Sequence, residues 1–152
     1  MRILLVLPAA EHLRITDPCQ KVPRRAMKRF SLLGLETVAA LTPDRHRVEL
    51  CDENVRPLDL EADVDLVGIS FMTAYAPRAY EIAARFRARG IPVIGGGYHP
   101  TLNPEDALDH LDAVVAGDAE TTWPRLLEDL EAGRLQRLYT SRGACSLAAV
   151  PR

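Results

Sequence analysis

Three short segments of the chain carry residue types that can hold a ligand. Residues 70–77 (SFMTAYAP) combine two hydroxyls, a thioether and an aromatic ring, and residues 117–122 (GDAETT) bring two carboxylates. Between them, residues 95–102 read GGGYHPTL. Glycine has no side chain, so a ligand can approach that backbone closely. The chemistry indicated is ligand binding against the backbone.

Each of these features also has an ordinary structural interpretation. The glycine run can form a tight turn, and His99 can be a hydrogen-bonded loop residue without a chemical role. Met72 can fill a core, and Asp118 and Glu120 can be acids favoured by the positive end of a helix dipole. We favour a site because all three segments directly follow predicted strands.

Strands and helices alternate along the chain. Short apolar runs such as RILLVL are typical of strands buried on both faces. Apolar residues at helical spacing, with proline or glycine at their ends, indicate the helices. We expect strands at 2–7, 47–51, 65–70, 91–95 and 113–116, a possible short strand at 135–139, and helices at 26–41, at 77–89, from an Asn103 cap onward and at 122–132.

This alternation predicts an α/β fold of the flavodoxin-like (Rossmann-like) type, with a doubly wound parallel five-stranded sheet in the order 2-1-3-4-5. Ligands of such sheets bind outside the carboxyl ends of the strands, where the strand order reverses. The three segments follow the third, fourth and fifth strands, so they meet at this rim. We expect one domain over residues 1–140 and a linker or tail at 141–152 toward a further domain.

Size and composition are those of one globular domain. The chain has 152 residues, of which 47% are hydrophobic and 26% charged, and its formal net charge is −2. This balance points to no nucleic-acid partner and no membrane partner, and residues 3–7 are too short for a signal or transmembrane segment. Cys19, Cys51 and Cys145 are odd in number and widely spaced, so we expect reduced thiols in a cytoplasmic protein, without disulfides or a zinc site.

Several common motifs are absent from the sequence. No GxGxxG follows the first strand, and neither GxxxxGK[ST] nor GxSxG is present. A phosphate-accepting receiver would carry an acid at the end of its third strand, where Ser70 stands here. The sequence therefore argues against a dinucleotide fold, a P-loop, a receiver and a hydrolase of the nucleophile-elbow type.

Longer stretches around the three segments resemble a known family. The stretches SFMTAYAPRAYEIA, IPVIGGGYHPTLNPEDAL and VVAGDAETTWPRLL resemble the amino-terminal cobalamin-binding domain of cobalamin-dependent radical SAM enzymes of the methyltransferase type, over residues 1–139. GGGYHPTLNPE is similar to that family's GGxHPT loop. AGDAE is similar to its GEGE-type loop, from which Asp118 and Ala119 depart.

The resemblance implies that the domain holds cobalamin with its nucleotide tail inserted beside the sheet. Backbone and hydroxyl groups after the third and fourth strands would line the tail pocket, and the segment after the fifth strand would close its far side. The implied cofactor-binding residues are Ser70, Met72, Thr73, Ala74, Tyr75, Gly95, Gly96, Gly97, Tyr98, His99, Pro100, Thr101, Gly117, Asp118, Ala119 and Glu120.

The resemblance also implies how the cobalt is ligated. Another cobalamin class uses a DxHxxG motif after the first strand, whose histidine binds cobalt. His12 lies in the corresponding connection here, but Asp17 and Pro18 do not rebuild that motif. The implied cofactor is therefore base-off and His-off, with no metal ligand or catalytic residue from this chain. Tyr75 is the first candidate for the lower cobalt face and Met72 the second.

The full family carries a downstream radical SAM barrel with a CxxxCxxC motif, which this sequence lacks. The resemblance implies a cofactor module for methyl transfer that is not catalytic alone, with SAM and a 4Fe-4S cluster in a radical SAM domain supplied in cis or in trans. The alternatives are a stand-alone flavodoxin-like regulatory or interaction domain without a cofactor, and a flavin binder. The basic residues within 21–29 could contact the tail phosphate or an acidic domain face, or form a solvated helix start.

Overall fold

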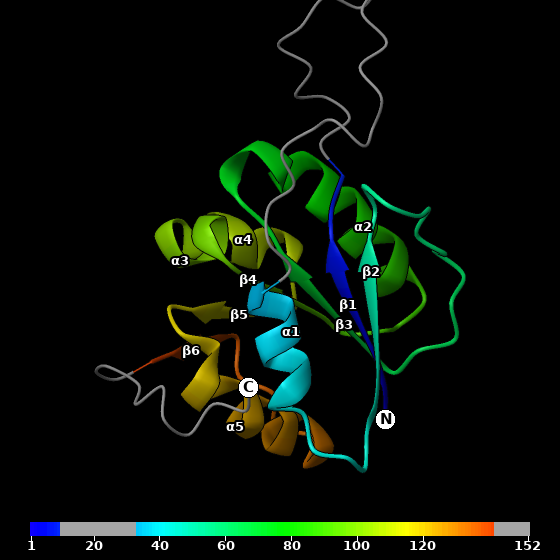
Figure 1. The fold of residues 1–152 in the computed structure, drawn as a ribbon. Coiled ribbons are helices and arrows are strands. Elements are labelled where there is room, and N and C mark those ends of the chain that lie inside the picture. The colour runs from blue at the N-terminus through cyan, green and yellow to red at the C-terminus, as the bar shows by residue number, and fades with distance from the viewer. Residues whose placement is uncertain (10–32, 142–152) are drawn as a thin grey trace, which may run out of the picture.

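The computed structural model of the chain describes residues 1–9 and 33–141. In this part of the chain strands and helices alternate, as the sequence predicts (Figure 1). The strands are β1 (Arg2–Leu7), β2 (Arg47–Asp52), β3 (Leu66–Ser70), β4 (Val93–Gly96), β5 (Ala113–Ala116) and β6 (Leu138–Thr140). The helices are α1 (Leu33–Ala40), α2 (Ala76–Ala88), α3 (Tyr98–Leu102), α4 (Pro104–His110) and α5 (Ala119–Glu131), with the short 3-10 helix η2 (Thr73–Tyr75) before α2.

The strands form one parallel sheet in the order β2-β1-β3-β4-β5-β6. The flavodoxin-like doubly wound fold is confirmed, and so is the order of the first five strands. The predicted count of five is one too low, because β6 pairs with β5 through Val115 and Tyr139. β6 overlaps the segment 135–139, where a further short strand was possible, and extends one residue beyond it. β2 is an edge strand, as its alternating sequence suggests.

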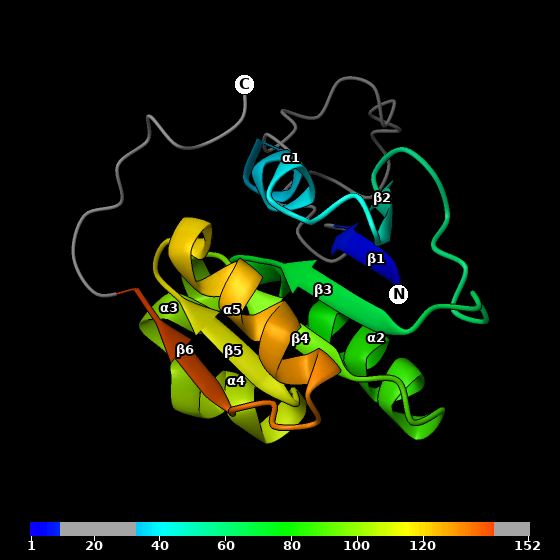
Figure 2. The same ribbon diagram turned by 90° about the horizontal axis from the view of Figure 1, so that it is seen from below.

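Helices cover both faces of the sheet. α1 and α5 lie on one face, and α2, α3 and α4 lie on the other (Figures 1 and 2). Side chains of a strand alternate between faces, so the apolar runs supply both layers. Leu66 and Ile94 pack on the α1/α5 side, whereas Val67 and Ile69 pack on the α2/α4 side. Burial on both faces explains why these strands are continuously apolar.

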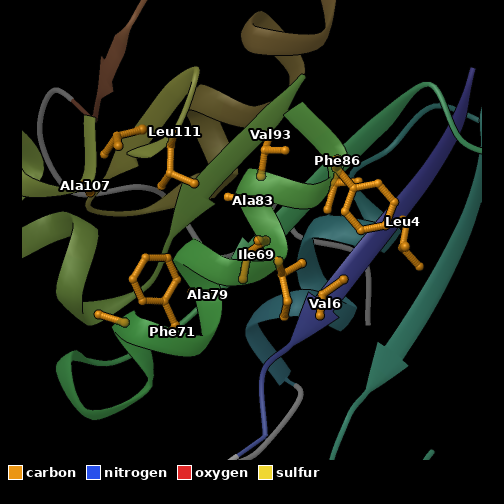
Figure 3. Packing of buried hydrophobic residues seen from close by; sticks show 14 of the residues in the cluster. Leu4, Val6, Ile69, Phe71, Ala79, Ala83, Phe86, Val93, Ala107 and Leu111 are labelled. Atoms are coloured by element: carbon orange, nitrogen blue, oxygen red, sulfur yellow. The ribbon is translucent and has the colours of Figure 1, made fainter. Parts of the chain in front are cut away.

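Alanine and phenylalanine side chains hold α2 close to the sheet. Ala79, Ala83 and Phe86 are fully buried, and Figure 3 shows them facing Val93 and the other strand residues of this layer. The small alanines bring the helix backbone near the sheet, and Phe86 fills the space at its carboxyl end. This layer fixes the position of the connection between β3 and α2.

Several element boundaries differ from the sequence-based expectation. α5 begins at Ala119 rather than at residue 122, which brings its first turn to the rim of the sheet. The expected loop after β4 contains the short helix α3, which starts directly after Gly97. α4 begins at Pro104 as expected, but the Asn103 side chain makes no capping hydrogen bond.

Some expectations fall on residues outside the described ranges. Of the helix expected at 26–41, the structure describes the part from α1 onward. His12, Cys19, Cys145, the basic residues within 21–29 and the tail after residue 141 lie outside the described residues. No helix in the described ranges is long and apolar enough to cross a membrane.

Candidate functional site

A cavity of about 350 Å³ lies between the sheet and the helices α1 and α5, at the carboxyl ends of the strands. Its walls come from four strands, from the loops that follow two of them, and from α1 and α5. The lining residues are Leu5, Leu33, Gly34, Leu35, Thr37, Val38, Gly68, Ile69, Ser70, Ile94, Gly95, Gly96, Gly97, Val115, Gly117, Asp118, Ala119, Glu120 and Trp123.

Of two glycines on neighbouring strands, one leaves the sheet wall of this cavity bare. A Cβ atom at Gly96 would have Val115 O, 3.9 Å away, as its nearest neighbour. A Cβ at Gly68 would lie 2.8 Å from Leu5 Cδ2 and 3.7 Å from the Trp123 ring. The open space beside β4 therefore depends on Gly96, whereas the place of a side chain at Gly68 is already taken by Leu5 and Trp123.

The three consecutive glycines serve three different purposes. Gly96 opens the cavity, but a Cβ at Gly95 would point to the opposite face, where it would overlap Leu111. Gly95 thus allows α3 and α4 to pack closely on the sheet. Gly97 has a φ of 92°, and a Cβ there would lie 2.9 Å from Ser70 Oγ and 3.0 Å from the Phe71 backbone. Gly97 therefore makes the turn into α3.

The rim of the cavity is polar. Ser70 ends β3, and Asp118 and Glu120 stand at the beginning of α5. The Thr101 hydroxyl accepts a hydrogen bond from the Gly117 amide over 3.0 Å, which ties α3 to the loop after β5. The Ser70 hydroxyl and the two carboxylates can hydrogen-bond hydroxyl or amide groups of a ligand.

The inner walls of the cavity are apolar. They come from the middle of the strands and from α1 and α5, and the side chains are Leu5, Leu35, Val38, Ile94, Val115 and Trp123. Trp123 is buried, and its indole N–H donates a hydrogen bond to the Thr42 hydroxyl over 2.9 Å. The cavity is therefore polar at its mouth and apolar inside.

The sequence of the chain matches a known protein family. The family model described as the B12 binding domain matches residues 28–127, which are 100 of the 152 residues. The chain belongs to the B12-binding domain family. The resemblance that the sequence motifs carry is thus confirmed.

Two curated relatives of this B12-binding domain come from Chlorobaculum tepidum. Bacteriochlorophyllide d C-8(2)-methyltransferase is 42% identical over 111 residues, which are 72% of this chain and 25% of that protein. Bacteriochlorophyllide d C-12(1)-methyltransferase is 34% identical over 110 residues, which are 70% of this chain and 24% of that protein. The matched part of the B12-binding domain therefore spans about a quarter of the length of these relatives.

One solved structure also matches. The N-terminal domain of a hypothetical protein from Thermotoga maritima is 26% identical with a TM-score of 0.48, and the match covers 80% of this chain and all of that one.

The residues around the cavity of this B12-binding domain fit the nucleotide tail of cobalamin. The volume of about 350 Å³ is in the range of small-molecule sites. The open position at Gly96 forms a cradle that a side chain would fill. A polar mouth and an apolar interior suit a tail with a phosphate and a ribose toward one end and an aromatic base at the other.

The cavity brings together half of the residues that the sequence singled out. Those lining it are Ser70, Gly95, Gly96, Gly97, Gly117, Asp118, Ala119 and Glu120. Those that do not line it are Met72, Thr73, Ala74, Tyr75, Tyr98, His99, Pro100 and Thr101. The second group lies on the β3–α2 connection and on α3, and two of its members, His99 and Pro100, are buried.

His99 belongs to a hydrogen-bonded cluster on the opposite face of the sheet. Its Nε2 lies 2.9 Å from the Tyr80 hydroxyl and 2.9 Å from Asp106 Oδ2, and its Nδ1 lies 3.2 Å from the Thr73 hydroxyl. Tyr80 donates to Asp106 over 2.6 Å. Hydrogen bonds from Tyr80 and His99 lower the pKa of Asp106, and burial raises the pKa of Tyr80. The cluster connects α2, α3 and α4 to the β3–α2 loop.

The remaining rim residues differ in exposure. Tyr98 is 73% exposed and Leu102 72% exposed, side by side on α3. Tyr75 is half-buried against the α2 layer, and burial raises the pKa of its phenol. Met72 is also half-buried, whereas Thr73 and Ala74 are exposed.

Sequence reasoning missed Gly68, Trp123 and the wall that α1 contributes. Gly68 had a readable signal, because an isolated glycine inside a strand often marks close approach of a ligand or backbone. Trp123 and Val38 had no such signal, since an apolar residue at helical spacing looks the same whether it faces a core or a cavity.

Proposed function

We propose that this chain binds cobalamin as the cofactor module of a radical SAM methyltransferase. The nucleotide tail enters the cavity, and the corrin ring lies over the carboxyl rim of the sheet. The observation that carries this proposal is the open space at Gly96, which leaves the sheet wall bare at the rim of the cavity. The family match and the methyltransferase names of the two relatives support it.

The chain's own residues supply binding and orientation. Ser70 and the loop from Gly117 to Glu120 meet the polar part of the tail at the cavity mouth. The apolar walls then exclude water from the base and hold it away from cobalt. When bound, cobalamin supplies a cobalt centre that can carry a methyl group between a donor and an acceptor.

The proposed state of the cofactor is base-off and His-off. In this proposal the base lies in the cavity. The imidazole ring of His99 is already hydrogen-bonded to Tyr80, Asp106 and Thr73. The loop after β3 borders the lower cobalt face, with Tyr75 as the first candidate neighbour and Met72 as the second. Burial raises the pKa of Tyr75 above the ordinary phenol value, so the neutral form of the side chain is favoured further.

The catalytic partner in this proposal is a radical SAM domain, in cis or in trans. SAM and a 4Fe-4S cluster belong to that domain, because this sequence has no CxxxCxxC motif. The relatives are about four times longer than the part matched here, which leaves them room for a further domain. Residues 141–152 would lead toward it, and the whole would act in the cytoplasm.

Reconstitution tests the binding. Purified chain mixed with hydroxocobalamin is expected to keep corrin absorbance through gel filtration. Gly96→Val is expected to abolish that retention while leaving the fold intact, because its side chain enters open space. Ala116→Val is the matched control, since Ala116 ends the neighbouring strand but packs on the opposite face.

Electron paramagnetic resonance of the reduced Co(II) form tests the ligation. A spectrum without nitrogen superhyperfine splitting is expected for the base-off, His-off state, and nitrogen splitting would contradict it. If the wild-type chain retains no corrinoid and Gly96→Val behaves like wild type in every assay, the proposal fails and a domain without a cofactor remains.

A further inference from the structure

The polar and apolar parts of the cavity lie at different depths. Ser70 and Gly96 end their strands, whereas Gly68 and Ile94 lie two positions earlier. Each strand residue advances about 3.3 Å, so on β3 and β4 the apolar wall begins roughly 7 Å below the rim, while Val115 on β5 brings apolar surface up to the level of Gly96. A ligand that reaches this depth buries its inner end entirely among side chains of the apolar wall.

The polar atoms near this inner wall already have partners. The Trp123 indole N–H donates to Thr42, whose own hydroxyl donates to the Val38 carbonyl over 2.8 Å. The Thr37 hydroxyl donates to the Leu33 carbonyl over 2.8 Å. Among the lining residues that the structure describes, the inner side chains therefore offer no free hydrogen-bond donor.

We infer that the inner cavity selects the lower base of the corrinoid, taking a benzimidazole and rejecting a purine. This inference rests on the proposed function, because it concerns the base at the end of the same tail. It adds a specificity that membership of the family does not supply. The specificity-determining residues are those of the apolar wall, above all Val38, Ile94, Val115 and Trp123.

The physical reason is the cost of burying polar groups without partners. Dimethylbenzimidazole has a single free ring nitrogen, and its benzo ring carries two methyl groups that match apolar walls. Adenine brings three free ring nitrogens and an exocyclic amine. An unpaired buried donor or acceptor lowers an equilibrium constant by about tenfold or more, so the adenine-containing corrinoid should bind at least about tenfold more weakly.

The protein contains its own reporter for this measurement. Trp123 is the single tryptophan of the chain and lines the cavity, so a corrinoid in the site should quench its fluorescence. Titrations of the 152-residue chain would use cobalamin, adeninylcobamide and cobinamide, which lacks the nucleotide tail. The expected order of affinity is cobalamin first, adeninylcobamide weaker by about tenfold or more, and cobinamide weaker than cobalamin.

The outcomes separate the inference from the function on which it rests. If none of the three corrinoids binds, the proposed function itself fails. If cobinamide binds as tightly as cobalamin, the tail does not occupy the cavity and the inference is overturned. If cobalamin binds more tightly than cobinamide but only as tightly as adeninylcobamide, the tail is bound and the inference about base selection is overturned.

Isosteric substitutions test whether the apolar walls cause the selection. Val115→Thr and Val38→Thr each add a hydroxyl at nearly constant shape, and should narrow the ratio of the two affinities by about threefold, the worth of one neutral hydrogen bond. Val48→Thr is the control, because Val48 packs on the same face without lining the cavity. An unchanged ratio in both cavity variants would overturn the assignment to these walls.

Discussion

The indole N–H of Trp123 and the hydroxyl of Thr42 are joined by a buried hydrogen bond of 2.9 Å. Trp123 lies on α5, and Thr42 follows the end of α1. The bond thus connects the two helices that cover the cavity, and it sets their spacing over the sheet. The same tryptophan ring lines the cavity and lies next to Gly68, 3.7 Å from the place of a Cβ atom there.

Removing the acceptor of this bond should destabilise the domain. Thr42→Val leaves the indole N–H buried and unpaired, which is expected to lower the free energy of unfolding by about 1–3 kcal/mol. Urea denaturation followed by circular dichroism measures the effect. In a Trp123→Phe background, where the indole N–H is already gone, Thr42→Val should lower the free energy of unfolding clearly less. Equal costs in the two backgrounds would show that the bond contributes nothing.

Gly97 should not tolerate a side chain. Gly97→Ala forces an alanine to a φ of 92° and brings its Cβ to about 3 Å from Ser70 Oγ and the Phe71 backbone. We expect a loss of more than about 2 kcal/mol in the free energy of unfolding, together with lost corrinoid binding. Gly90→Ala is the matched control, because Gly90 has a φ of 75° but nothing within 4 Å of the added Cβ. If Gly90→Ala loses as much stability as Gly97→Ala, the loss comes from backbone strain alone and not from the contacts with Ser70 and Phe71.

The ion pair between Glu53 and Arg78 should stabilise the carboxyl end of the sheet. The Glu53 side chain is 6% exposed, its Oε1 lies 2.6 Å from an Arg78 guanidinium nitrogen, and its Oε2 accepts from the Ala9 amide over 2.9 Å. Arg78→Ala leaves this buried carboxylate without its cation. We expect it to lower the free energy of unfolding by about 1–3 kcal/mol, a value between those of exposed and fully buried ion pairs.

The control for this pair is Arg85→Ala, which breaks a pair in which Arg85 is 63% and Glu61 71% exposed. Exposed pairs contribute at most about 1 kcal/mol. Chemical denaturation at low and high salt compares the two variants. If Arg85→Ala proves as costly as Arg78→Ala, burial of Glu53 is not the reason for the effect.

Asp106 should make the stability of the domain sensitive to acid. Its pKa lies below the ordinary value because Tyr80 and His99 hydrogen-bond to the carboxylate. A lowered folded-state pKa means that the stabilisation is complete above the unfolded pKa, about 4, and is lost as the pH falls through the folded value. Wild type should therefore exceed Asp106→Asn in stability at neutral pH, and the gap should close below about pH 4.

Urea midpoints measured across this pH range check the prediction. Asp109→Asn alters an exposed carboxylate on the same helix and serves as the control. A gap between wild type and Asp106→Asn that persists unchanged at low pH would mean that the ionised carboxylate is not what stabilises the cluster.

Much of the fold could be predicted from local pattern. The apolar runs of β1 and β3 are buried on both faces, and proline at the beginning of α4 marks its start, as expected. Short strands alternating with helices leave few topologies, because parallel crossovers are right-handed. β6 and α3 were harder to predict, since both are short and follow no strong periodic pattern.

The sequence by itself determined that a glycine-rich rim would lie at the carboxyl ends of a parallel sheet. The reason is that residue order and strand direction place the loops without any knowledge of packing. Only the tertiary structure decided what each residue does there. Gly96 opens a cavity while Gly95 faces Leu111, because neighbouring strand positions point to opposite faces. His99 meets Tyr80 and Asp106, which lie on two other helices, and such long-range contacts leave no local signature.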